Sequence, residues 1–220
     1  VEMIEADGGH TYDQGQHYER SETQAINKDL LGSWDRHSLE TVTPLADANA
    51  SECAHEGAEA LVSSLSARDR DWGFKDPRTC LTYGFWKQVL PAHKLVCIFR
   101  DAFEVSEHYR RHYRRPLESL HAWYVYNQAM LEAYQAAPLD ARLLLDHDRL
   151  MRSDGEIERL SRFLGRPVSD RRDLRLRRSR VKGRWRWEAA KLVYRLKTGS
   201  SIAALNRRLK QLAAEGSAYD

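Results

Sequence analysis

The sequence has no long hydrophobic run and contains little cysteine. No segment approaches the roughly 18 apolar residues that a membrane-spanning helix requires. The first residues, VEMIEAD, have neither the basic nor the apolar region of a signal peptide. Only 3 cysteines occur in 220 residues, and Cys97 lies inside a short apolar segment. We therefore expect a cytoplasmic protein without a membrane span, whose thiols are reduced and not paired in disulfides.

Metal-ligand patterns and a strong net charge are also missing. The chain has no C-x-x-C pair and no cluster of carboxylates, so we expect no metal site. The formal charge of +3 is too small to argue for a polyanionic partner. Arginine and lysine nevertheless crowd residues 171–186, which could bind nucleic acid, form a solvated loop or line a cleft for an anionic substrate. We favour the last two readings and keep a nucleic-acid-binding module as an alternative.

What is present suits one globular domain over residues 1–220. The composition, 42% hydrophobic and 30% charged, is ordinary for a protein with a sizeable core. Apolar spacing predicts helices over residues 21–31, 51–68, 102–114, 116–136, 156–164, 187–196 and 200–214. Short apolar runs predict parallel strands over residues 70–75, 94–100 and 142–147. Ser21 and Ser51 are the expected N-caps of the first two helices, and Gly165 the expected end of the helix over 156–164. The expected fold is an α/β domain with a short parallel sheet flanked by helices.

The strongest pattern surrounds the strand over residues 94–100. The run from Lys94 to Phe99 is apolar after its first residue and shows no alternation, which is typical of a strand buried on both faces of a parallel sheet. Arg100 then falls at the carboxyl end of this strand, and Asp101 follows as the N-cap of a helix. A guanidinium beside a helix N-terminus favours a bound phosphate or sulfate. The run Trp72–Phe74 similarly leads to Lys75 and Arg78 at a second predicted strand end.

Several motifs together resemble those of sulfotransferases that use 3′-phosphoadenosine-5′-phosphosulfate (PAPS), particularly the bacterial and carbohydrate-type branch. The motifs are K-D-P-R at 75–78, V-C-I-F-R-D-A-F-E-V at 96–105, G-Q-H-Y-E at 15–19, the helix L-H-A-W-Y-V-Y-N at 120–127 and S-R-F-L-G at 161–165. The resemblance implies a P-loop-like three-layer fold. It also implies transfer of a sulfuryl group from PAPS, without a required metal, to a hydroxyl or amine of a carbohydrate or small metabolite.

The resemblance assigns donor-binding roles. Arg100 matches the family's arginine for the 3′-phosphate of the donor. The family's companion serine, eight positions later, is replaced by His108, and Ser106 could substitute for it. Lys182-Gly183 is similar to the R-K-G segment that reaches the 3′-phosphate in cytosolic sulfotransferases. Arg78 is a further candidate because we expect it at the same sheet edge.

The resemblance also assigns catalytic roles. Lys75 matches a lysine near the transferred group. Glu19 matches the glutamate of the family's G-Y-F-E segment and is the first choice for the base that takes the acceptor's proton. Asp76 and His17 are the rivals for that role.

A phosphate loop is absent from these 220 residues. Gly8-Gly9 has no apolar strand before it and no helical pattern after it, so it is not such a loop. The resemblance implies a first strand, a glycine-rich 5′-phosphosulfate loop and a first helix before the point that matches Val1. We therefore expect the natural protein to extend upstream of Val1. The alternative is a degenerate sulfotransferase-like protein that binds a partner and catalyses nothing.

Overall fold

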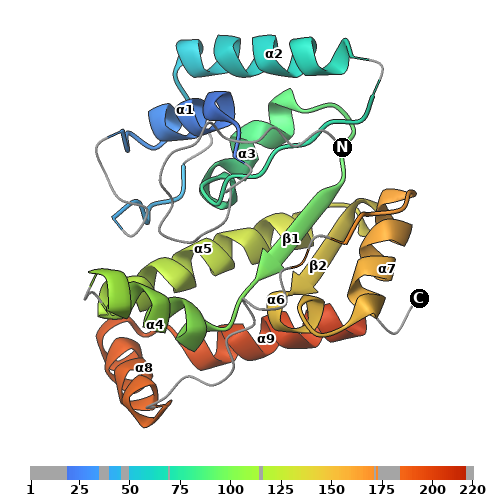
Figure 1. Ribbon diagram of the computed structural model, residues 1–220. Helices are drawn as coiled ribbons and strands as arrows, with labels where there is room; N and C mark the ends of the chain where they lie inside the picture. Colours follow the sequence, from blue (N-terminus) through green and yellow to red (C-terminus); the bar gives the residue numbers. More distant parts are fainter. Residues whose placement is uncertain are drawn as a thin grey trace. The chain divides into compact units, whose positions relative to one another are not determined.

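A computed structural model describes residues 19–34, 40–45, 50–68, 70–113, 116–170, 172 and 184–216 (Figure 1). Over these residues the protein is mixed α/β and mostly helical, with a short two-stranded parallel sheet packed against helices. The predicted fold class is thereby confirmed. The chain divides into two compact units, residues 1–92 and 93–220. A single domain over residues 1–220 stays a prediction.

The described part of the first unit consists of three helices. They are α1 (Ser21–Leu30), α2 (Glu52–Ser66) and α3 (Thr79–Val89). Their apolar faces meet in one core that includes Leu65, Phe85 and Trp86. Ser51 caps α2 as predicted, because its side chain accepts a hydrogen bond from the Ala54 N–H at 3.1 Å. The prediction that Ser21 caps α1 is wrong by one residue, since the N-cap position is occupied by Arg20.

The predicted strand over residues 70–75 is wrong. An isolated bridge at Trp72 is all the β-structure that these residues contain. The side chains of Trp72 and Phe74 pack against the helical core of the first unit, with the Phe74 and Trp86 ring centroids 4.8 Å apart. A short apolar segment can bury its rings against helices without pairing with a strand. The local sequence pattern does not distinguish such a segment from a strand within a sheet.

The second unit contains the sheet. Strands β1 (Leu95–Phe99) and β2 (Arg142–Asp146) pair in parallel, from Leu95 opposite Arg142 to Phe99 opposite Asp146. Both strands were predicted. The expectation that β1 is buried on both faces is wrong, because Val96 and Ile98 are 39% and 47% exposed whereas Cys97 and Phe99 are buried.

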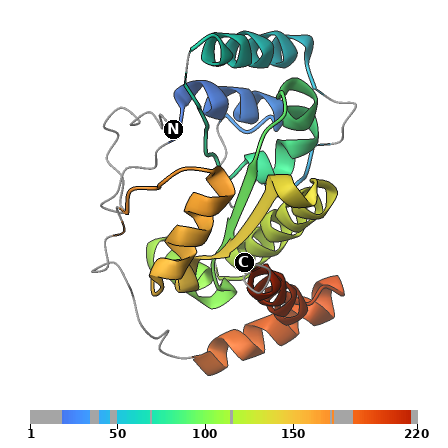
Figure 2. The same ribbon diagram turned by 90° about the vertical axis from the view of Figure 1, so that its right-hand side faces the viewer.

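The described helices of this unit pack against the sheet or against the helices that cover it. They are α4 (Ala102–Tyr113), α5 (Pro116–Ala136), α6 (His147–Leu150), α7 (Asp154–Leu164), α8 (Arg184–Thr198) and α9 (Ile202–Glu215), with a 3-10 turn at Leu139–Ala141. Helices α5 and α7 lie on either side of the strands (Figure 2), and α9 packs against α5 and β2. Gly165 ends α7 with a positive φ of 75°, as predicted. Among the described residues, no helix combines the length and apolar character needed to cross a bilayer.

Candidate functional site

The first candidate cluster lies at the carboxyl edge of the two-stranded sheet. Because Phe99 and Asp146 are paired, the next residues along the two strands, Arg100 and His147, leave the sheet at the same edge. Helix α4 begins at Ala102, directly after Arg100. The sequence therefore predicted correctly that Arg100 stands between a strand end and a helix N-terminus, where an anion is favoured.

Arg100 is oriented from two sides. Its Nε donates a hydrogen bond at 2.8 Å to the carboxylate of Glu104, which lies in the first turn of α4. Its backbone carbonyl accepts a hydrogen bond from the indole N–H of Trp123 on α5 at 2.8 Å. Within the described part of the chain, the terminal nitrogens Nη1 and Nη2 have no hydrogen-bond partner, and the side chain is 34% exposed. One edge of the guanidinium is thus fixed while the other stays open to a ligand.

His147 is a member of this cluster that sequence reasoning missed. Burial lowers the pKa of its imidazole below the ordinary value, and the positive charge of Arg100 lowers it further. Glu104, Asp146 and Asp148 act in the opposite direction. The register of the two strands could have revealed this residue, because His147 follows β2 as Arg100 follows β1.

The lowered pKa of His147 predicts how stability depends on pH. Below about pH 6.5, the ordinary pKa of histidine, the unfolded chain takes up a proton that the folded protein resists. The free energy of unfolding should therefore fall as the pH decreases through this region. His147→Gln should reduce this fall, as measured by urea unfolding at pH 7.5 and pH 5.5. An unchanged difference between the two pH values would contradict the prediction.

The two candidates for the companion of Arg100 both lie on α4. Ser106 is fully buried, and its hydroxyl has no hydrogen-bond partner among the described residues. The ring of His108 packs edge-on against Tyr109, with centroids 5.6 Å apart. These observations do not identify either side chain as a phosphate ligand. The roles of Ser106 and His108 therefore remain predictions.

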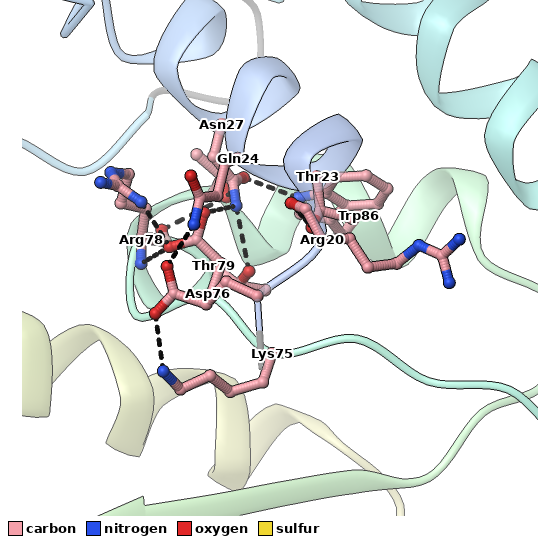
Figure 3. Close-up of polar contacts among 11 residues, drawn as sticks. Arg20, Thr23, Gln24, Asn27, Lys75, Asp76, Arg78, Thr79 and Trp86 are labelled. Carbon is pink, nitrogen blue, oxygen red and sulfur yellow. Dashed lines mark hydrogen bonds and ion pairs between the residues drawn. The ribbon is translucent and has the colours of Figure 1, made fainter. Parts of the chain in front are cut away.

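The second candidate cluster, in the first unit, is organised around Glu19, and its partners Gln24 and Lys75 are labelled in Figure 3. Lys75 Nζ lies 2.6 Å from Glu19 Oε1, and Gln24 Nε2 donates to Glu19 Oε2 at 2.6 Å. The Glu19 side chain is 10% exposed and that of Lys75 is 47% exposed. The two residues that the sequence named separately as base and cation are therefore an ion pair. A carboxylate fixed through both oxygens is well placed to accept a proton in one defined direction.

Asp76 occupies a different environment. Its side chain is completely buried. One carboxylate oxygen accepts hydrogen bonds from the Arg78 N–H and guanidinium, both at 2.9 Å, and the other accepts from Asn27 Nδ2 at 3.0 Å. This carboxylate holds the turn that leads into α3. The arrangement gives Arg78 a structural partner, and the choice of base between Glu19 and Asp76 stays a prediction.

Asn27 is the second residue that sequence reasoning missed, and it links α1 to the turn and to α3 (Figure 3). Its amide also donates to the Thr79 hydroxyl at 3.2 Å. Its carbonyl oxygen accepts hydrogen bonds from the Thr82 hydroxyl at 2.6 Å and the Trp86 indole at 2.8 Å. The available signal was an amide that falls beside Ile26 and Leu30 on the predicted inner face of a helix.

Several predicted site residues lie outside the described residues. These are His17, Lys182 and Gly183, together with most of the basic stretch 171–186. Across the part of the chain that the structure describes, there is no group of three or more His, Cys, Asp or Glu side chains that could hold a metal ion.

Comparison with known proteins identifies the family. The profile of the sulfotransferase family matches residues 8–170, which is most of the chain and includes Glu19, Lys75, Arg100 and His147. The chain therefore belongs to the sulfotransferase family, whose members typically use PAPS as the sulfuryl donor. No curated protein and no solved structure gives a significant match.

Proposed function

We propose that the protein is an enzyme of the bacterial and carbohydrate-type branch, which transfers a sulfuryl group from PAPS to a hydroxyl or amine of a carbohydrate or small metabolite. The observation that carries this proposal is Arg100. It belongs to a sulfotransferase family chain, stands at a strand end and a helix N-terminus, and presents an open guanidinium edge. These features suit the 3′-phosphate of the donor.

Sulfuryl transfer requires a base for the acceptor's proton and positive charge near the leaving phosphate, and the proposed residues can supply both. A bond forms between the acceptor oxygen or nitrogen and sulfur, the bond between sulfur and the 5′-phosphate oxygen breaks, and negative charge grows on the departing phosphate. The acceptor also loses a proton. Fixed cations stabilise the growing charge, and a positioned carboxylate takes the proton, so no metal is required.

Glu19 and Lys75 suit the roles of base and cation. When Glu19 accepts the acceptor's proton, its carboxylate becomes neutral and its attraction for Lys75 weakens. The ammonium group, 2.6 Å from Glu19 in the resting structure, can then interact more strongly with negative charge that develops nearby. The ion pair thus places the proposed base and a cation side by side, so that proton transfer to Glu19 changes the charge next to Lys75.

The proposal is tested first by donor binding. Calorimetry should show that adenosine 3′,5′-bisphosphate binds at least about tenfold more tightly than adenosine 5′-monophosphate, because the 3′-phosphate adds a charge-assisted contact. Equal binding of the two nucleotides would contradict the proposal. Tight, steeply salt-dependent binding of oligonucleotides, without preference for the bisphosphate, would favour the nucleic-acid alternative.

Glu19→Gln separates catalysis from binding. The variant keeps the size of the side chain but has no carboxylate to accept a proton, so turnover should fall roughly 100- to 10,000-fold. Affinity for the bisphosphate should not change. Glu22→Gln, an exposed position in the first turn of α1, is the matched control and should keep full turnover.

Two other outcomes would change the assignment of the base or of the function. Full turnover in Glu19→Gln would move the role of base to Asp76 or His17. Specific bisphosphate binding by a parent protein that transfers no sulfuryl group to any acceptor would favour the degenerate binding protein.

A further inference from the structure

Helix α9 makes a direct connection to the turn that carries Arg100. Asp101, the next residue, accepts hydrogen bonds through Oδ2 from Asn206 Nδ2 and Lys210 Nζ of α9, both at 3.1 Å. Through Oδ1 it accepts from the Phe103 N–H at 2.9 Å and so caps α4. Helix α9 lies wholly beyond residues 8–170, the segment that matches the family. The contact therefore joins the candidate donor site to a part of the chain that the family match does not include.

The contact with α9 offsets the negative charge that Asp101 places at the candidate donor site. A carboxylate directly after Arg100 places negative charge beside the position proposed for a phosphate, which repels an anion. Burial raises the pKa of Asp101, but the Phe103 N–H, Lys210 and Asn206 outweigh it and lower the pKa overall. Asp101 is thus held as an anion whose charge is directed toward a helix N-terminus on one side and an ammonium on the other.

Helix α9 is held in place by its buried face and its N-cap, so it can present Asn206 and Lys210 to Asp101 in fixed positions. Asn206 and Lys210 stand one helical turn apart, so their side chains share a face of the helix. Leu205 and Leu209 are buried, and Ser201 caps the helix through the Ala204 N–H at 3.2 Å. The other amide atom of Asn206, Oδ1, is buried without a hydrogen-bond partner among the described residues. Among the described residues, the Asn206 amide therefore bonds to Asp101 through its NH2 group, and its carbonyl oxygen makes no hydrogen bond.

We propose that Lys210 and Asn206 are positioning residues of the donor site. They hold Asp101 in place as the cap of α4 and offset its charge, so that Arg100 and the first N–H groups of α4 can receive the 3′-phosphate. This inference rests on the proposed role of Arg100.

The test is Lys210→Met, which removes the ammonium and keeps most of the stem. Affinity for adenosine 3′,5′-bisphosphate should fall about 3- to 5-fold, the upper range for a part-exposed ion pair. Affinity for adenosine 5′-monophosphate, which lacks the 3′-phosphate, should stay unchanged. Lys210→Arg should restore most of the lost affinity.

Arg207→Met is the matched control, because it removes one positive charge from the exposed surface of the same helix. It measures the general effect of charge on an anionic ligand, which we expect to be below about 1.5-fold because solvent and salt screen it. Equal losses in Lys210→Met and Arg207→Met would overturn the inference.

A double-mutant cycle adds a readout that simple destabilisation would not move. Asp101→Asn can still cap α4 but has no charge for Lys210 to offset. In this background, Lys210→Met should cost no more affinity than the Arg207→Met control. A full 3- to 5-fold loss in that background would mean that Lys210 acts on the ligand directly and would overturn the positioning role. Failure of the proposed function is separate, because it would appear as unchanged affinity in Arg100→Ala.

Discussion

Arg100→Ala should weaken binding of adenosine 3′,5′-bisphosphate roughly 10- to 150-fold, which corresponds to ~1.5–3 kcal/mol for a charge-assisted contact. The guanidinium is already held by Glu104, and the backbone carbonyl of the residue is anchored by Trp123. Little ordering remains to be done when the phosphate arrives, so most of the contact's energy should appear as affinity. The loss of the side chain would remove the guanidinium that we propose as the main partner of the 3′-phosphate and leave the N-terminus of α4 in place.

Calorimetry on two ligands checks this expectation. Affinity for adenosine 5′-monophosphate should change little in Arg100→Ala, since that ligand lacks the group that Arg100 is proposed to bind. Arg100→Lys should give an intermediate loss, because it keeps the charge and loses the bidentate fork. Unchanged bisphosphate affinity in Arg100→Ala would remove the donor-site assignment altogether.

The position of Arg100 could be predicted from sequence because it depends on local signals. An apolar run marks the strand, a charged pair marks its end, and an aspartate marks the start of the next helix. The second strand, over residues 142–146, was predicted in the same way. His147 follows from the same reasoning applied to that strand, and it was missed because no motif draws attention to it.

The polar contacts that could not be predicted from the sequence join residues that lie far apart along the chain. The hydrogen bonds of Asn27 connect residues 49 and 59 positions apart, and Lys210 meets Asp101 across 109 positions. Apolar periodicity predicts which face of a helix is buried, but not which polar group on another element completes a buried hydrogen bond. The false strand over residues 70–75 has the same origin, because tertiary packing of Trp72 and Phe74 decided their conformation.

Asn27→Leu should be the most destabilising of the changes considered, at about 3–5 kcal/mol of unfolding free energy. Leucine is close to asparagine in size, so the loss comes from hydrogen bonding and not from a large cavity. The Trp86 indole N–H would be left buried without a partner, and the Asp76 carboxylate would lose one of its donors. Thr82 can instead donate to the Arg78 carbonyl at 3.3 Å, which limits the total cost.

The buried charge of Asp76 provides the control for this last prediction. In an Asp76→Asn background, Asn27→Leu should cost less than in the parent protein, because a neutral amide suffers a smaller penalty than a carboxylate when it loses a donor. Urea unfolding followed by tryptophan fluorescence measures all four proteins of this cycle, since Trp86 lies within the network. A loss below about 1 kcal/mol for Asn27→Leu would show that the network adds little to stability. The turn that presents Lys75 to Glu19 would then have to be held by Arg78 and the packing of α3 alone.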